Sequence, residues 1–165
     1  MMRSAIFIGI LAFLTHVNDS LASTWTTEIE KDPFENTESM TAFAAYTFRS
    51  GFFLMCDKGS EKIEVRVPTE MNFYESGFVE YSKSAIKVAN DKGFKSELLA
   101  LVTSNQSGNA MFVGFADNEK SKEIIDAILT AQSKIYVKLG EGDVWDISAR
   151  GSTRVAQEFE KFCGF

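Results

Sequence analysis

Apolar and polar residues alternate in many short segments of this chain, and this period of two predicts β-strands. In the clearest case, the segment 62–67, isoleucine and valine occupy every second position and charged residues stand between them. Glycine, asparagine, aspartate and serine separate the segments and indicate tight turns. The pattern therefore predicts a mainly β fold, either an antiparallel sandwich or a barrel-like sheet. We expect strands at 24–30, 40–48, 52–56, 62–67, 77–87, 98–104, 110–116, 134–139 and 144–149.

Two segments change to the helical period of about 3.6 residues. In 119–132, isoleucine and leucine recur at a spacing that places them on one face of a helix, and Asn118 is expected to cap its first turn. Near the C-terminus, Ser152 or Thr153 is expected to cap a second short helix, whose apolar stripe runs beside Cys163. The expected fold is thus a mainly β domain with two short α-helices.

The first residues differ in character from the rest of the chain. Arg3 is followed by an apolar run over 5–14, and small residues precede a cleavage point after Ala22. This layout is typical of a secretory signal peptide. The alternative, a membrane-spanning helix, needs about 20 apolar residues, and this run is shorter. We therefore expect residues 1–22 to be removed on export and residues 23–165 to form a single, mostly β domain in the periplasm or outside the cell.

The charge and the histidine content narrow the possible functions. The chain has 17 basic and 23 acidic residues, which give a formal charge of −6, and this acidity argues against binding to nucleic acid or anionic lipid. The single histidine, His16, lies in the expected signal peptide, so the exported chain would contain none. A protein without histidine cannot use a Ser-His-Asp or Cys-His mechanism or a histidine-containing metal site. We expect a non-enzymatic protein without metal or cofactor; the exception left open is a carboxylate-based glycan hydrolase.

Cys56 and Cys163 are the two cysteines of the chain. In an oxidising compartment two cysteines usually pair, so we predict one intramolecular disulfide. This bond would hold the C-terminal helix against the strand that contains Cys56. Free or intermolecular thiols are the alternative, and the absence of a CxxC spacing gives no support to a redox enzyme.

Aromatic residues are frequent, with 15 Phe, 4 Tyr and 2 Trp. Most of them are expected in the core, because large apolar side chains are usually buried. The segment 72–77 is different, since it has the composition of a loop. Aromatic side chains in and beside this loop are candidates for a binding surface that stacks on a ligand or a partner: Phe73, Tyr74, Phe78 and Tyr81.

One ordered set of features carries a resemblance to a known family: Trp25 in the first strand, Asp32-Pro33 with Asn36, the alanine-rich segment 40–46, Phe53-Leu54-Met55-Cys56, the alternating segment 63–67, Lys134-Ile135-Tyr136-Val137-Lys138, Ile147, Gly151-Ser152 and Phe162-Cys163. In this order they resemble the TagO/VasI family of exported proteins associated with type VI secretion, over nearly all of residues 23–165. The chain departs from the family at 79–82, where the family has an Arg-Ile-Asp-type strand. The resemblance implies a non-enzymatic, accessory role in the bacterial periplasm, and it supports the Cys56–Cys163 bond.

Two functions fit these features. The first is a periplasmic accessory or binding protein of the bacterial cell envelope, associated with type VI secretion, whose partner is an envelope or secretion-system protein. The second is a secreted inhibitor or immunity-type protein that binds a basic hydrolase such as a lysozyme, because charge complementarity accelerates such an encounter. In both cases we expect no integral membrane span once the signal peptide has been removed.

Overall fold

Nine antiparallel strands form one curled sheet in a computed structural model that describes residues 24–165. The predicted signal peptide, residues 1–22, lies outside the described residues. Along the sheet the strand order is β1-β2-β3-β4-β7-β6-β5-β8-β9. The strands are β1 (Thr26–Lys31), β2 (Glu38–Ala45), β3 (Gly51–Asp57), β4 (Ile63–Asn72), β5 (Ser82–Asn90), β6 (Lys95–Ser104), β7 (Asn109–Ala116), β8 (Lys134–Leu139) and β9 (Val144–Ser148).

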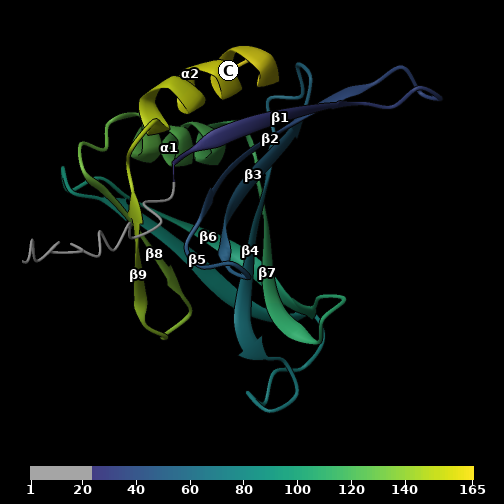
Figure 1. Ribbon diagram of the computed structural model, residues 1–165, viewed down its shortest axis with the longest axis vertical. Coiled ribbons are helices and arrows are strands. Elements are labelled where there is room, and N and C mark those ends of the chain that lie inside the picture. The colour runs from purple at the N-terminus through teal and green to yellow at the C-terminus, as the bar shows by residue number, and fades with distance from the viewer. Residues whose placement is uncertain (1–23) are drawn as a thin grey trace, which may run out of the picture.

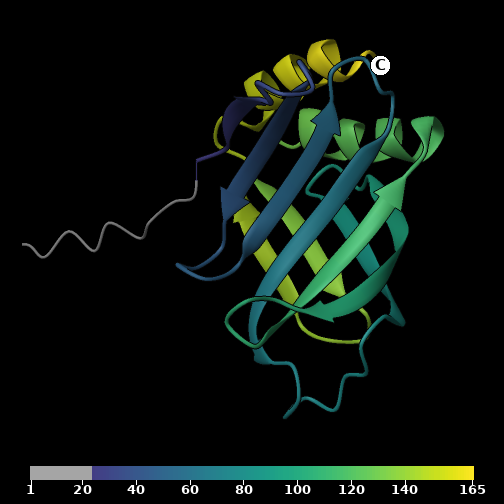
Figure 2. The same cartoon turned by 90° about the vertical axis from the view of Figure 1, so that its right-hand side faces the viewer.

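The sheet bends into a half-barrel, and two helices, α1 (Asn118–Leu129) and α2 (Ser152–Cys163), lie side by side across one of its ends (Figure 1, Figure 2). The prediction of a mainly β fold with two short helices is confirmed. Of the two arrangements left open, the barrel-like sheet is the one adopted, since every strand belongs to the same sheet. Neither helix of the described chain combines the length and the apolar content needed to cross a bilayer.

The core fills the inside of the curl. Every second residue of the central strands is buried, as the period of two requires. At the helix end, α1 and α2 close the core from above with apolar side chains that include Ile124, Ile128 and Phe159, each buried. Amphipathic helices of this kind gain most of their stability from such packing. The opposite end of the half-barrel has no helix and consists of turns and a loop.

The two edges of the sheet meet along a seam that has no strand ladder. At the helix end, the buried Trp25 donates its indole N–H to the carbonyl of Ser148 (3.0 Å), and its backbone N–H goes to the carbonyl of Arg150 (3.1 Å). These bonds join the residue before β1 to the end of β9 and to the residues that lead into α2. The half-barrel is therefore held shut at this seam by a few specific contacts.

The disulfide fastens α2 to the sheet. Cys56 in β3 and Cys163 at the end of α2 are bonded, with their Cα atoms 6.0 Å apart, and 107 positions separate them in the sequence. Two backbone hydrogen bonds continue the contact, because Gly59 and Glu61 in the following turn donate to the carbonyls of Phe162 (3.0 Å) and Cys163 (2.9 Å). The predicted pairing is confirmed.

Both predicted helix caps need correction. Asp117, and not Asn118, caps α1, because its carboxylate accepts the N–H of Lys120 (3.0 Å). The helix α2 begins after Gly151, whose left-handed backbone (φ 83°) suits a residue without a side chain. The hydroxyl of Ser152 lies buried without a hydrogen-bond partner in the described chain, so it does not act as a cap.

The segment around the predicted binding residues is also arranged differently from the prediction. The strand β4 continues through Pro68 to Asn72, and the expected strand 77–87 begins only at Ser82. Asn72 ends β4, because its side-chain oxygen accepts the N–H groups of Tyr74 and Glu75 (both 3.1 Å) and so starts a turn. Residues 73–81 consequently form a loop.

Candidate binding surface at the loop end

The end of the half-barrel away from the helices is built from three turns and one loop. We call this surface the loop end and define it as residues 46–50, 70–81, 105–108 and 140–145. These segments connect β2 to β3, β4 to β5, β6 to β7 and β8 to β9. In Figure 1 the loop between β4 and β5 and the turn between β8 and β9 lie at the lower end of the molecule, and the helices lie at its upper end. Loops held on a rigid sheet are a frequent place for binding residues, because their side chains are free to vary while the scaffold fixes their position.

The four predicted binding residues all lie in the loop 73–81, but not all on its surface. Tyr74 and Tyr81 are 76% and 69% exposed. Phe73 is 2% exposed and belongs to the core, and Phe78 is half-buried against it, with ring centroids 6.1 Å apart. Phe78 also meets the ring of Phe112 edge-on (5.7 Å). The two phenylalanines thus anchor the loop, and the two tyrosines are presented to solvent.

Sequence reasoning missed several exposed apolar residues of the same end. Two come from the turn after β2, one from the last residues of β4 and one from the loop 73–81: Tyr46, Phe48, Met71 and Val79. Tyr46 and Phe48 fell in an expected strand, but β2 ends at Ala45 and the turn begins at once. The sequence Arg49-Ser50-Gly51 after Phe48 indicates a turn, but it marks only where the turn ends and does not show that the turn already begins at Tyr46.

An aromatic groove lies within the loop end, in a cavity of about 380 Å³. The rings of Tyr46 and Trp145 stack in parallel along it, with centroids 5.1 Å apart and planes 5° apart. Glu70 and Asp143 add carboxylates to the lining. The carboxylate of Glu70 accepts a hydrogen bond from the hydroxyl of Thr47 (2.6 Å), and within the described chain neither acid forms an ion pair. The groove therefore combines flat apolar rings with uncompensated negative charge.

Charge is distributed unevenly over the loop end. Its acidic residues are Glu70, Glu75, Glu80, Glu141 and Asp143, whereas Arg49 is its one basic residue. Only Glu141 has cationic neighbours in the described chain, because Lys87 (3.2 Å) and Lys138 (3.5 Å) approach it from the outer face of the sheet and lower its pKa. Much of the net negative charge of the protein is thus concentrated at this end.

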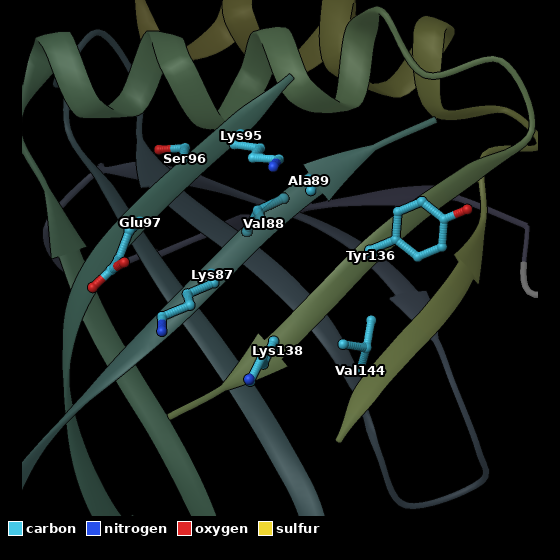
Figure 3. A pocket seen from close by; sticks show the side chains of 9 residues that line it. All are labelled: Lys87, Val88, Ala89, Lys95, Ser96, Glu97, Tyr136, Lys138 and Val144. Atoms are coloured by element: carbon cyan, nitrogen blue, oxygen red, sulfur yellow. The ribbon is translucent and has the colours of Figure 1, made fainter. Parts of the chain in front are cut away.

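A second cavity, of about 520 Å³, lies on the outer face of β5, β6, β8 and β9 (Figure 3). Lys87, Lys95 and Lys138 surround it, and Tyr136 and Val144 form its apolar side. Two of these lysines are already close to Glu141, and nearby Lys134 pairs with Asp146, which raises the pKa of the lysine and lowers that of the aspartate. This second cavity is basic, but nearby carboxylates neutralise much of its positive charge. It is therefore a weaker candidate for a binding site than the loop end.

Several carboxylates of the described chain have a pKa that their neighbours shift. The carboxylates with a shifted pKa are all shifted downward, by lysine, arginine or hydrogen-bond donors, so they stay ionised at neutral pH. A general acid for glycoside hydrolysis requires the opposite shift. Among residues 24–165, no three histidine, cysteine, aspartate or glutamate side chains are grouped so that they could hold a metal ion.

No family model, curated protein or solved structure matches this chain. The resemblance to the TagO/VasI family therefore stays a prediction from the sequence.

Proposed function

We propose that this protein is an exported, non-enzymatic binding protein of the bacterial cell envelope that contacts its partner with the loop end. The observation that carries this proposal is the exposure of Tyr74, Val79 and Tyr81 on one loop of the loop end, the same end of the half-barrel that holds the aromatic groove of Tyr46 and Trp145. Exposed aromatic side chains are enriched at protein interfaces because they bury much area with little loss of side-chain freedom. Association with type VI secretion is proposed on the sequence resemblance alone.

The construction of the fold supports a binding role for this end. At the other end, the helices and the Cys56–Cys163 bond hold the sheet in a fixed shape. Phe73 and Phe78 tie the exposed loop to the core. A surface that is ordered before it binds loses less entropy on association, so a rigid scaffold of this kind favours affinity.

A second candidate function is inhibition of a basic hydrolase, and the charge of the loop end is the observation that favours it. Glu70 and Asp143 flank the stacked rings of Tyr46 and Trp145. An arginine or lysine of a partner would find both a ring face and a carboxylate there. Such a complex would form rapidly at low salt and weaken as salt screens the charges.

The experiment for the first proposal is affinity capture from envelope extract, with residues 23–165 as bait. The variant Tyr74→Ala/Tyr81→Ala should lose the captured partner, and Phe34→Ala should retain it, because Phe34 is exposed in the turn between β1 and β2, far from the loop end. If the double variant captures the same partner with unchanged yield, the loop end is not the binding surface. Capture of cytoplasmic proteins alone would contradict both candidate functions.

The two candidates are separated by salt and by an enzyme assay. Capture that persists at high salt supports an accessory protein, whereas a partner that is lost at high salt and proves to be a basic hydrolase supports an inhibitor. Inhibition of a basic lysozyme by the wild type, reduced in Glu70→Gln/Asp143→Asn, would decide for the second candidate. Turnover of peptidoglycan by the protein itself would show that the non-enzymatic assignment is wrong.

A further inference from the structure

The outer face of the sheet carries two groups of apolar side chains, one on each side of the central strand β4, that no helix covers. The five neighbouring strands of this region are β2, β3, β4, β7 and β6. Both helices lie across the end of the half-barrel and leave this outer face free (Figure 2). We call the set the sheet patch: Phe43, Phe53, Met55, Leu99, Leu101, Met111, Val113 and Phe115.

The strand register places these side chains next to one another. Phe43 pairs with Phe53 across β2 and β3, and their rings stack with centroids 5.5 Å apart. On the other side of the patch, Val113 pairs with Leu101 across β7 and β6. Leu99 and Phe115 flank the adjoining pair of Ala100 with Gly114 and are 64% and 67% exposed. The apolar side chains are therefore neighbours within each group, and the two most exposed members, Leu99 and Phe115, stand side by side.

Apolar side chains on the solvent-facing side of a sheet require an explanation. Outward positions on a solvated antiparallel sheet are usually polar, so the alternation of apolar and polar residues marks the buried face. Here β6 and β7 carry apolar residues on the outer face as well. Folded monomers rarely expose apolar patches larger than a few hundred Å², and larger ones mark interaction sites.

One ion pair lies in the middle of the patch and indicates what covers it. Glu64 and Arg66 stand on β4, the central strand of the five, and the Nε of Arg66 contacts Oε1 of Glu64 at 2.6 Å. Phe53 and Val113 flank Arg66, while Met55 and Phe115 flank Glu64 in the same way. Within the described chain, no hydrogen bond or ion pair occupies the terminal Nη groups of Arg66 or Oε2 of Glu64.

We propose that the sheet patch binds a second copy of the same chain, with the two-fold axis perpendicular to the two β4 strands and midway between the positions of Glu64 and Arg66. A two-fold interface brings a surface against itself, so its centre must be self-complementary. One negative and one positive group side by side meet this condition, because the rotation places each Arg66 opposite the partner's Glu64. The unused Nη donors and the unused Oε2 acceptor then form charge-assisted hydrogen bonds across the interface.

The dimer is independent of the proposed binding function and adds to it. The loop end remains outside the sheet patch, so each dimer would present two loop ends. Two linked binding surfaces raise the overall affinity for a partner with repeated sites, with no new contact to either one. A membrane or an unrelated protein could cover the sheet patch instead. The central Glu64–Arg66 pair favours a second copy of the chain over both, because only that copy is certain to present the complementary pair.

The first test is the molar mass of residues 23–165 in solution, by light scattering or sedimentation, up to the highest soluble concentration. We expect a concentration-dependent dimer, and a weakening of at least about ten-fold for Phe115→Lys, which buries an unpaired charge. Ile29→Lys is the matched control. Ile29 is 55% exposed, but it pairs with the inward-facing Met40 and so lies outside the sheet patch. A monomeric wild type, or a dimer unaffected by Phe115→Lys, would overturn the proposal.

The second test exploits the reciprocity of the ion pairs. Glu64→Arg and Arg66→Glu each place like charges at the axis, so each variant alone should be monomeric. An equimolar mixture of the two should form a heterodimer, and Glu64→Arg/Arg66→Glu should dimerise again. Circular dichroism verifies that each variant is folded. If the mixture stays monomeric while the wild type dimerises, the dimer does not have this axis.

Discussion

Tyr46 and Trp145 stack face to face across the seam of the half-barrel, with ring centroids 5.1 Å apart. Tyr46 follows β2 and Trp145 lies in β9, so this contact joins opposite edges of the sheet at the loop end. At the helix end of the same seam, Trp25 donates its indole N–H to the carbonyl of Ser148. Side chains therefore hold the seam where the strands do not pair. A ligand in the aromatic groove would therefore touch the Tyr46–Trp145 stack, which is one of the two contacts that close the seam.

The variant Tyr46→Ala tests whether the stack stabilises the seam. We expect a loss of about 0.5–1.5 kcal/mol in the free energy of unfolding, beyond the effect of the lost buried area, since aromatic pairs contribute about that amount. The fluorescence of Trp145 should shift to longer wavelength, while the buried Trp25 provides a constant background. Urea unfolding and emission spectra measure the two effects.

Phe48→Ala is the control for the stack. Phe48 lies in the same turn and is 98% exposed, so its removal should change stability by no more than about 0.5 kcal/mol. Equal losses for the two variants would show that the turn, and not the ring contact, is responsible.

The disulfide should contribute a large share of the stability. Closing a loop of 107 residues in the unfolded chain corresponds to about 4–5 kcal/mol in the chain-entropy model. We expect Cys56→Ser/Cys163→Ser to lose about 2–5 kcal/mol, because measured values fall below the ideal one. Chemical denaturation measures the loss, and a reductant should lower the stability of the wild type and leave the double variant unchanged. A variant as stable as the oxidised protein would contradict this account.

Much of the fold could be predicted from the sequence, because burial on one face of a strand enforces a period of two. In the segment 62–67 apolar and charged residues alternate, and in β4 buried and half-buried positions alternate in the same way. The disulfide was predictable from the number of cysteines and the expected compartment. The choice between a sandwich and a curled sheet was not, because alternation shows which face is buried but not whether a second sheet or the same sheet covers it.

The candidate surface was only partly predictable, and the reasons lie in tertiary contacts. Phe73 looked like a loop residue, but it is buried, since Asn72 turns the chain and directs its ring into the core. Tyr46 and Trp145 are far apart in the sequence and come together only through closure of the sheet. A local sequence pattern cannot predict a contact between residues so far apart in the chain. Tyr74 was predictable because its exposure depends mainly on the local loop, whereas Tyr81 was expected in a strand and is exposed because the loop extends as far as β5.

Gly114 in β7 should tolerate no side chain. A Cβ built on Gly114 would lie 2.4 Å from Cδ2 of Leu98 and 3.1 Å from the backbone oxygen of Leu99. Overpacking of this kind costs about 1–3 kcal/mol, so we expect Gly114→Ala to unfold at lower denaturant. The variant Leu98→Ala/Gly114→Ala should lose less than the sum of the two single losses, because it removes the contacted side chain. If the two single losses of stability simply add up in the double variant, the cost of the added Cβ comes from its contact with the backbone and not from the Leu98 side chain.

Asp91 should make the fold sensitive to acid over a defined range of pH. Its carboxylate accepts hydrogen bonds from the Ser133 hydroxyl and from the N–H groups of Gln132 (2.9 Å) and Ser133 (2.8 Å), which lower its pKa from 3.8 to about 2. Because the folded pKa lies below the unfolded one, this stabilisation is complete above pH 3.8 and is lost as the pH falls through about 2. Melting temperatures of the wild type and Asp91→Asn, measured at high salt to screen the surface ion pairs, should converge over this range. A constant difference between the two would exclude titration of Asp91 as the cause.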